Sequence, residues 1–203
     1  MSGNTQPDFR EAKLDPDLLS THFKVQTNWH VITGASCSGK TTMVDQLASK
    51  GFQISPEVAR LYFEGEFAKG RTIDEIREDK VTFTNQIYGM WLKLLGELRA
   101  DRITFLDRGI PDALTFYRYI GLDPNLILPD CFQHRYASVF LLNRLPYQKD
   151  GVRAGDDAVA DYFESWTLKD YIALGYNVVR VPVLAPEERL TFILETLTDG
   201  GIL

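Results

Sequence analysis

The chain has 203 residues, of which 44% are hydrophobic and 25% are charged. These are the proportions of a globular protein, and they exclude a disordered or fibrous chain. The formal net charge is −6 and no long basic block is present, which argues against a protein that binds nucleic acid or anionic membranes through a large basic surface. A chain of this length can bury a core without disulfides or a structural metal.

Cysteine usage and the distribution of apolar residues favour a cytoplasmic protein. Cys37 and Cys131 form neither a CxxC motif nor a Cys/His cluster, so a zinc site is not expected. The first 20 residues lack the apolar run that marks a secretory signal. No stretch approaches the roughly 18 uninterrupted apolar residues that a membrane span needs.

The chain divides into a polar beginning and a long patterned part. Residues 1–28 are polar and carry little periodicity, which predicts a loose N-terminal arm, although the segment LDPDLLSTHF could form a helical turn. From residue 29 onward, short apolar runs alternate with segments of helical periodicity. The apolar runs predict strands at 29–33, 52–55, 102–107, 137–143 and 177–183. The segments between them predict helices at 40–50, 56–70, 78–100, 111–120, 158–174 and 186–198.

Alternation of apolar strands with helices is typical of βαβ units. Such strands form a parallel sheet that is covered by helices on both faces. Thr72 and Glu75 have the spacing of a capping box, which predicts a short helical turn before the long helix. Residues 143–157 contain proline, glycine and many charged groups, which predicts a mobile loop. We therefore expect one α/β domain over residues 29–203.

The strongest motif matches GxxxxGK[ST] and lies between a predicted strand and a predicted helix. Its residues, with the threonine that follows, are Gly34, Ala35, Ser36, Cys37, Ser38, Gly39, Lys40, Thr41 and Thr42. Backbone N–H groups of such a loop, together with the helix N-terminus, bind phosphate groups. Lys40 would contact the β- and γ-phosphates, and the Thr41 hydroxyl would bind Mg²⁺. The sequence thus predicts a P-loop (Walker A) NTPase that binds Mg-ATP.

A carboxylate that helps to hold Mg²⁺ or water is expected at the end of another strand. Asp107 ends the predicted strand 102–107 and fits this position. The alternative is that Asp107 only caps a turn or helix. Arg108 follows directly and could face the transferred phosphoryl group.

Several segments together resemble a known family. They are VITGASCSGKTT, ISPEVAR, FLDRG-IPD, YASVFLL with DGVR, and LGYNVVRVPV-APEER. They are similar to the small P-loop kinase-like domain of the AAA_28/NadR type, whose relatives include nicotinamide riboside kinases and, more distantly, deoxynucleoside and thymidylate kinases. The resemblance covers about residues 29–197 and implies a five-stranded sheet of order 2-3-1-4-5 and an arginine-bearing lid. At Gly109 the sequence departs from it, because deoxynucleoside and thymidylate kinases have DRS or DRY there.

Candidate residues for a second substrate follow the second strand and lie on the long helix. Glu57 stands where ligands collect in open parallel sheets and could accept a proton from an attacking hydroxyl; the alternative is that it complements a helix dipole. The resemblance agrees, because deoxynucleoside kinases place a glutamate at the equivalent strand end. Arg60 could bind an acceptor phosphate or pair with Glu57. Gln86, with Phe83 and Tyr88 nearby, could bind the edge of a base or carboxamide, or it could face solvent.

The loop at 143–157 carries the remaining candidate. Arg153 resembles the lid arginine of small kinases, which closes on the phosphates and stabilises transition-state charge. The alternatives are that Arg153 is an ordinary solvated arginine, or that Arg144 or Lys149 takes its place. After the last strand, APEER resembles the segment that lies under the nucleotide base in related kinases.

These observations predict a phosphotransferase that uses Mg-ATP and a small, nucleoside- or nucleotide-like acceptor. The alternative is a nucleotide-binding switch, an ATPase or GTPase that acts on a protein or lipid partner. The NKxD stretch of common GTPases is absent. A homodimer is compatible with the sequence, whereas a nucleic acid partner is not expected.

Overall fold

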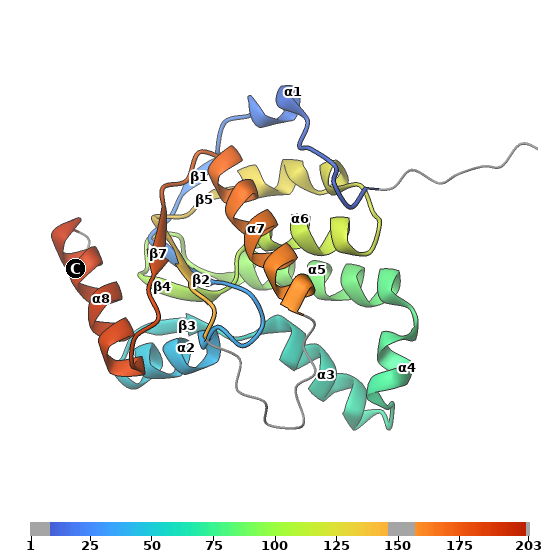
Figure 1. The fold of residues 1–203 in the computed structure, drawn as a ribbon, viewed down its shortest axis with the longest axis horizontal. Coiled ribbons are helices and arrows are strands. Elements are labelled where there is room, and N and C mark those ends of the chain that lie inside the picture. The colour runs from blue at the N-terminus through green and yellow to red at the C-terminus, as the bar shows by residue number, and fades with distance from the viewer. Residues whose placement is uncertain (1–8, 146–156, 202–203) are drawn as a thin grey trace, which may run out of the picture.

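A five-stranded parallel sheet forms the centre of the protein (Figure 1). The computed structural model describes residues 9–145 and 157–201. The strands of the sheet are β2 (Trp29–Thr33), β3 (Gln53–Ser55), β4 (Thr104–Asp107), β6 (Ser138–Leu142) and β7 (Val178–Val181). Their order across the sheet is β3-β4-β2-β6-β7. This is the order 2-3-1-4-5 that the resemblance implies.

The central strand β2 fixes the edge at which the functional residues gather. It pairs in parallel with β4 on one side, Ile32 opposite Asp107, and with β6 on the other, Thr33 opposite Leu141. All five residues of β2 are buried, which explains why its sequence shows no polar alternation. Because every pairing in the sheet is parallel, the carboxyl ends of the strands lie along one edge.

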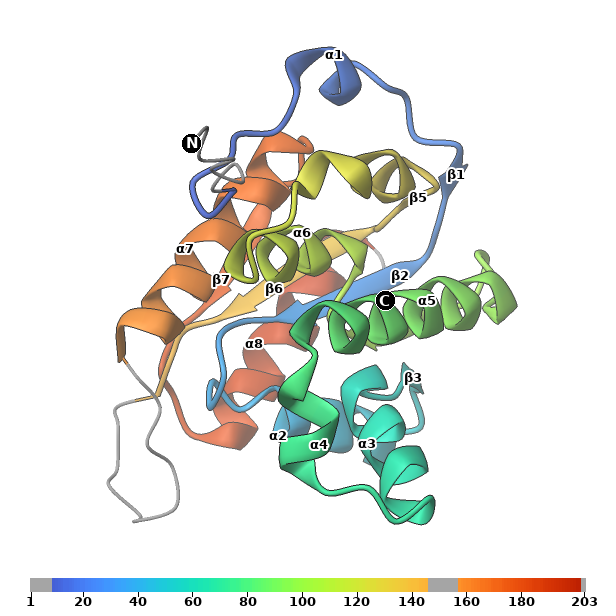
Figure 2. The ribbon, with the colours of Figure 1, turned by 90° about the vertical axis from the view of Figure 1, so that its right-hand side faces the viewer.

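Helices cover both faces of the sheet (Figures 1 and 2). The helices that follow β2 are α2 (Lys40–Ser49), α3 (Val58–Ala68), α4 (Ile73–Glu78), α5 (Lys80–Glu97), α6 (Ile110–Tyr119), α7 (Asp157–Ala173) and α8 (Pro186–Asp199). On one face α2 and α8 pack around Ile32, and on the other α5, α6 and α7 pack around Val31. Successive strand residues point to opposite faces, so neighbours in β2 serve two separate cores.

The start of the long helix follows its prediction closely. Thr72 and Glu75 form the predicted capping box of the short helix α4. Asp79 then interrupts the helix and caps α5, because its side chain accepts hydrogen bonds from the backbone N–H groups of Val81 and Thr82.

The predicted loose arm is wrong for residues 9–28, while residues 1–8 lie outside the described residues. Helix α1 (Pro16–Leu19) and strand β1 (Val25–Gln26) lie in this segment, and β1 pairs in parallel with β5 (His134–Arg135). Leu14 is buried, and the ring of Phe23 packs against Phe132. The helical turn considered for residues 14–23 is present as α1, whereas isolated apolar residues without periodicity gave no signal for the packing. The 3₁₀ helices η1 (Pro124–Leu126) and η2 (Leu128–Phe132), which precede β5, were not predicted either.

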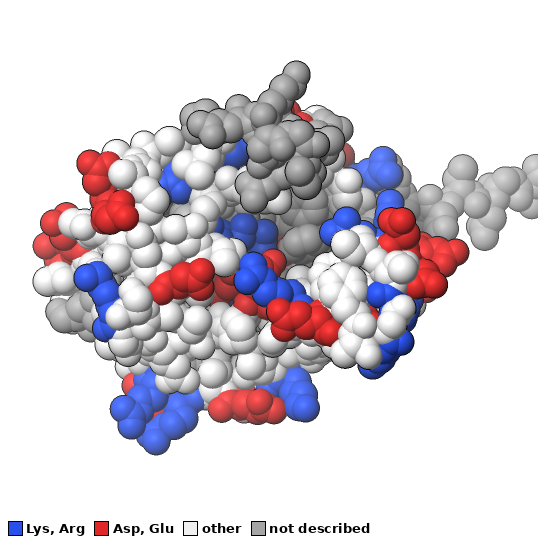
Figure 3. Space-filling model, turned by 90° about the horizontal axis from the view of Figure 1, so that it is seen from below, with Lys and Arg blue, Asp and Glu red and all other residues white. Residues whose placement is uncertain are grey.

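Charged side chains of both signs are mixed on the face formed by α2 and α3 (Figure 3). Basic and acidic groups alternate there, and neither sign forms a single large patch on the visible described surface. No described helix has both the length and the apolar character of a membrane span.

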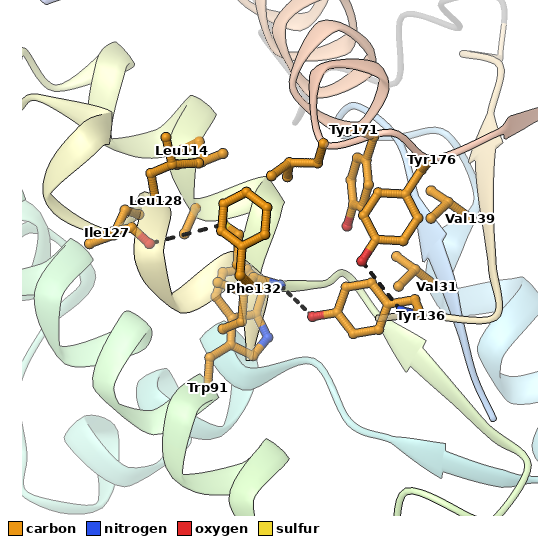
Figure 4. Packing of buried hydrophobic residues seen from close by; sticks show 14 of the residues in the cluster. Val31, Trp91, Leu114, Ile127, Leu128, Phe132, Tyr136, Val139, Tyr171 and Tyr176 are labelled. Carbon is orange, nitrogen blue, oxygen red and sulfur yellow. Dashed lines mark hydrogen bonds between the residues drawn. The ribbon is translucent and has the colours of Figure 1, made fainter. Parts of the chain in front are cut away.

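The larger core supports the chain just after β4 (Figure 4). Two hydrogen bonds of buried tyrosines lie in it: the Tyr136 hydroxyl accepts from the backbone N–H of Ile110 at 3.1 Å, and the Tyr176 hydroxyl accepts from the N–H of Tyr136 at 3.3 Å. Tyrosine hydroxyls in a core need such partners. The aromatic core therefore fixes the backbone where β4 passes into α6.

Candidate active site

The P-loop connects β2 to α2 through three residues with positive φ. Gly34, Cys37 and Gly39 have φ values of 145°, 61° and 89°. A Cβ atom on Gly34 would lie 2.8 Å from the carbonyl oxygen of Leu142 and 2.7 Å from the hydroxyl of Ser38. Both the backbone conformation and the close approach of β6 therefore require glycine at position 34.

A buried arginine of the last helix holds the P-loop in place. Arg189 is 2% exposed and donates hydrogen bonds to three backbone carbonyls: Ser38 in the loop at 2.6 Å, Asn143 after β6 at 2.9 Å, and Pro182 after β7 at 2.9 Å. These bonds tie the loop to the ends of two strands. Sequence reasoning missed this role, although the APEER segment contains Arg189.

Lys40 is the first residue of α2 and lies largely out of solvent. Its ammonium donates to the carbonyl oxygen of Ala35 at 2.9 Å. Burial, with a smaller effect of the Arg108 guanidinium, lowers the pKa of Lys40 to about 7 against the opposing pull of nearby carboxylates. Burial thus disfavours the charged form of Lys40, and a bound anion would stabilise that form.

This low pKa predicts that nucleotide binding takes up a proton. Phosphate oxygens favour the charged form of Lys40, so they raise its pKa. Above pH ~7 the affinity for Mg-ATP should therefore fall by up to about tenfold per pH unit. Calorimetric titration at pH ~8, in two buffers of different ionisation enthalpy, should report close to one proton taken up.

The exposed Lys50, at the end of the same helix, provides the control for that measurement. The Lys50→Met variant should bind Mg-ATP and take up a proton as the unchanged protein does. The Lys40→Met variant should bind Mg-ATP much more weakly and without proton uptake. An affinity that is independent of pH between ~7 and ~9 would contradict this role of Lys40.

Asp107 ends β4 with a buried carboxyl group. Its Oδ1 has no hydrogen-bond partner among the described residues, and burial raises the pKa of the carboxyl group while Arg108 and Lys40 oppose the rise. It does not cap α6, since Gly109 is the N-cap residue and Asp112 makes the capping bond. An unpartnered buried carboxylate oxygen is a fitting ligand for a cation.

The residues around Asp107 fit Mg²⁺ bound together with phosphates. No group of three or more His, Cys, Asp or Glu residues in the described ranges could hold a metal ion. Mg²⁺ commonly takes only one or two protein oxygens and keeps water or phosphate as its other ligands. Thr41, in the first turn of α2, and Asp107, at the end of β4, are the two residues that would hold it.

Arg108 is held by a buried aspartate that sequence reasoning missed. Asp112 is fully buried and accepts hydrogen bonds from Arg108 at 2.9 Å, the Thr33 hydroxyl at 2.5 Å, the N–H of Gly109 at 3.1 Å and the Tyr171 hydroxyl at 2.8 Å. Arg108 itself has a φ of 72°, a strained value for a residue with a side chain. The spacing of Asp112 after Gly109, which suits a helix cap, is the signal that could have found it.

The lack of space around Gly109 explains why the sequence has glycine where the DRS or DRY pattern has serine or tyrosine. A Cβ atom there would lie 2.7 Å from the Tyr171 hydroxyl and 2.8 Å from Cε2 of Tyr136. We therefore predict that Gly109→Ala destabilises the protein by about 1–3 kcal/mol, the usual cost of overpacking. Urea unfolding of both proteins measures the difference.

The matched control is Gly89→Ala in the middle of α5, where an added Cβ atom meets nothing within 4 Å. This change should stabilise the helix by about 0.5–1 kcal/mol. Equal stability of the Gly109→Ala variant and the unchanged protein would show that Tyr136 and Tyr171 do not define this turn.

A cavity of about 610 Å³ opens beside these residues. It is lined by Ser36 of the P-loop, by Asp107 and Arg108 at the end of β4, and by Glu57 after β3, together with residues of α3, α5, α6 and α7. Glu57 makes no capping hydrogen bond with its side chain, although it is the N-cap residue of α3. Glu57 thus lines the cavity, and its carboxylate does not serve the helix end.

The other predicted acceptor residues are placed differently. Arg60 does not line the cavity, and its guanidinium lies 3.6 Å from the Glu57 carboxylate, so the structure favours pairing with Glu57 over phosphate binding. Gln86 is exposed and outside the lining, which argues against its predicted contact with an acceptor. With 3.6 residues per turn, α5 turns Thr84, Ile87, Tyr88 and Trp91 to the cavity and Gln86 away from it.

Most of the predicted lid lies outside the described residues, and so do Arg153 and Lys149. Arg144 is described: its guanidinium pairs with Asp157 and Asp161 at the start of α7.

In the P-loop, Ser36 and Cys37 are exposed, and Thr42 is exposed in the first turn of α2.

The sheet order, the P-loop after β2 and the carboxylate at the end of β4 define a P-loop NTPase fold of the kinase-like type. The chain belongs to the AAA_28 family, described as an AAA domain, whose family profile matches residues 29–189. No curated protein sequence matches the chain significantly.

Solved structures of P-loop kinases share the fold. A deoxyadenosine kinase from M. mycoides, with dCMP and dCDP as products, is 17% identical with a TM-score of 0.58, over 84% of this chain and 98% of that one. The NadR protein in complex with NR is 19% identical with a TM-score of 0.60, over 85% of this chain but only 51% of that one. The shikimate kinase of Aquifex aeolicus is 19% identical with a TM-score of 0.50, over 86% of this chain and 98% of that one.

Proposed function

We propose that the protein is an ATP-dependent phosphotransferase that phosphorylates a hydroxyl group of a small acceptor. One observation carries the proposal: a single cavity is lined both by phosphate-site residues, Ser36, Asp107 and Arg108, and by Glu57 after the neighbouring strand. A second substrate bound there would lie next to the γ-phosphate of a nucleotide in the P-loop. A nucleotide-dependent switch has no need of such a cavity.

The proposed roles of the residues follow from their positions. Lys40 and the backbone N–H groups of the P-loop would bind the phosphates of ATP. Thr41 and Asp107 would hold Mg²⁺, which when bound offsets negative charge on the phosphoryl oxygens. Arg108, fixed by Asp112, would contact the transferred phosphoryl group.

Glu57 would take up the proton of the attacking hydroxyl. It lines the cavity and is partly exposed, with Arg60 as its ion-pair partner. A carboxylate in this position has hydrogen-bond access to a hydroxyl of an acceptor bound in the cavity, which is what a general base requires. Asp107 is the less suitable base, because its buried, unpartnered oxygen close to Lys40 suits it to the metal.

A substrate screen tests the proposal. The protein is incubated with Mg-ATP and fractions of a small-molecule extract, and mass spectrometry follows ADP and any compound that gains one phosphoryl group. We expect one fraction to accelerate ADP release and to contain a new phosphate ester, with no product from the Lys40→Met variant. Slow ATP hydrolysis that no fraction changes would favour the regulatory switch instead.

A further inference from the structure

The lining of the cavity restricts the chemistry of the acceptor, provided that the proposed phosphotransferase function holds. Among the described lining residues the charged ones are Glu57, Arg77, Asp107 and Arg108. Three of them lie at the carboxyl ends of β3 and β4, on the side of the cavity next to the P-loop. The fourth, Arg77, is exposed, and its guanidinium lies over the ring of Phe63 at 5.4 Å. No asparagine, glutamine, histidine or lysine occurs in the described lining.

Aromatic rings from four helices form much of the remaining wall. They are Phe63, Phe83, Tyr88, Trp91, Phe116 and Phe163. Phe63 and Phe83 pack with ring centroids 5.3 Å apart, and Phe116 and Phe163 with centroids 4.8 Å apart. Two aromatic pairs from different parts of the chain thus line one cavity, a surface that suits a flat apolar ring.

Two of the hydrogen-bonding groups in this lining are engaged within the protein, and the Thr84 hydroxyl and the Trp91 indole N–H are the other neutral ones among the aromatic walls. The Tyr88 hydroxyl donates to the Asp130 carboxylate. Arg108 is bound to Asp112 and lies over the ring of Phe116. The polar edge of a nucleobase, or the hydroxyls of a polyol, would find few partners here, and each unpaired buried group weakens binding by about tenfold.

We propose that the acceptor is an alcohol carried on an extended aromatic ring system with few polar substituents. The ring would pack among Phe63, Phe83, Phe116 and Phe163, with the hydroxyl directed to Glu57 and Asp107. The alcohol oxygen forms a bond to the γ-phosphorus of ATP while the bond between that phosphorus and the β–γ bridging oxygen breaks. The hydroxyl proton passes to the Glu57 carboxylate, and the products are ADP and a phosphate monoester.

Three probes compare acceptor classes on the full chain: 2-(naphthalen-2-yl)ethanol as the apolar aromatic alcohol, adenosine as a nucleoside and shikimate as a polyol. Calorimetry measures the binding of each, and mass spectrometry measures its phosphate ester in the presence of Mg-ATP. We expect the naphthyl alcohol to bind and react at least about tenfold better than the other two.

Two variants locate the binding site. Phe163→Leu keeps an apolar side chain but removes a ring of the wall, and it should weaken binding of the naphthyl alcohol by about three- to tenfold without changing Mg-ATP affinity. Phe192→Leu is the matched control, because Phe192 lies on α8, packs against the core on the other face of the sheet and is outside the lining; it should change neither. Thermal unfolding of both variants confirms that they are folded.

The outcomes separate this inference from the proposed function. Phosphorylation of adenosine or shikimate in preference to the naphthyl alcohol would overturn the acceptor class and leave the phosphotransferase intact. Binding of the naphthyl alcohol that depends on Phe163, with no phosphate ester formed, would support the ligand class and count against phosphoryl transfer. Failure of the naphthyl alcohol to bind would overturn the inference.

Discussion

Replacement of Lys40 by methionine is expected to weaken Mg-ATP binding by about 10²-fold or more, because one ammonium group meets the charge of two phosphates. The same change should not unfold the protein. Burial lowers the pKa of Lys40 to about 7, so folding already bears a cost for enclosing this charge. Methionine has a similar length and carries no such cost, and the variant should be at least as stable as the unchanged protein.

Calorimetric titration with Mg-ATP and a thermal unfolding curve measure the two effects of Lys40→Met. Lys50→Met, at the exposed end of α2, is the matched control and should bind Mg-ATP normally. Unchanged affinity in a folded Lys40→Met protein would rule out the P-loop as the nucleotide site.

Glu57→Gln is expected to slow phosphoryl transfer by about 10²-fold or more, the scale of losing a general base. Glutamine keeps nearly the same volume but cannot take up a proton at neutral pH. Binding of Mg-ATP should survive, since the P-loop follows a different strand. Stability should change little, because the Glu57 side chain caps no backbone group and its ion pair with Arg60 is exposed.

Glu64→Gln, on the same helix and exposed, is the control for the loss of a carboxylate and should leave the rate unchanged. Asp107→Asn should act differently, by raising the Mg²⁺ concentration needed for half-maximal rate. If Glu57→Gln transferred phosphate at the normal rate, Glu57 would not be the base.

Local signals in the sequence were sufficient to predict the elements that form the sheet and the P-loop. The apolar run 29–33 is a buried central strand, and the glycines of the P-loop adopt the positive φ values that such a loop requires. The parallel sheet followed from the alternation of strands and helices. The strand order needed the resemblance to a family, because spacing along the chain does not determine which strands pair.

Features that depend on contacts between residues far apart in the chain could not be predicted from the sequence. Arg189 lies 151 positions from its P-loop partner Ser38, and Tyr171 lies 59 positions from Asp112. The packing of residues 9–28 likewise depends on β5, more than a hundred positions away. Gln86 shows a second limit of prediction from sequence. The helix that contains Gln86 was predicted, but the sequence did not indicate which face of this helix lines the cavity.

Transfer of a labelled γ-phosphoryl group is the most direct test of the central claim. The protein is given [γ-³²P]ATP, Mg²⁺ and an accelerating extract fraction or aromatic alcohol, and the label is separated into inorganic phosphate and organic ester. We predict that most of the label appears in an organic ester, and that Glu57→Gln lowers this amount by about 10²-fold or more. Label found only in inorganic phosphate, at a rate that Glu57→Gln does not change, would contradict the proposed phosphotransferase.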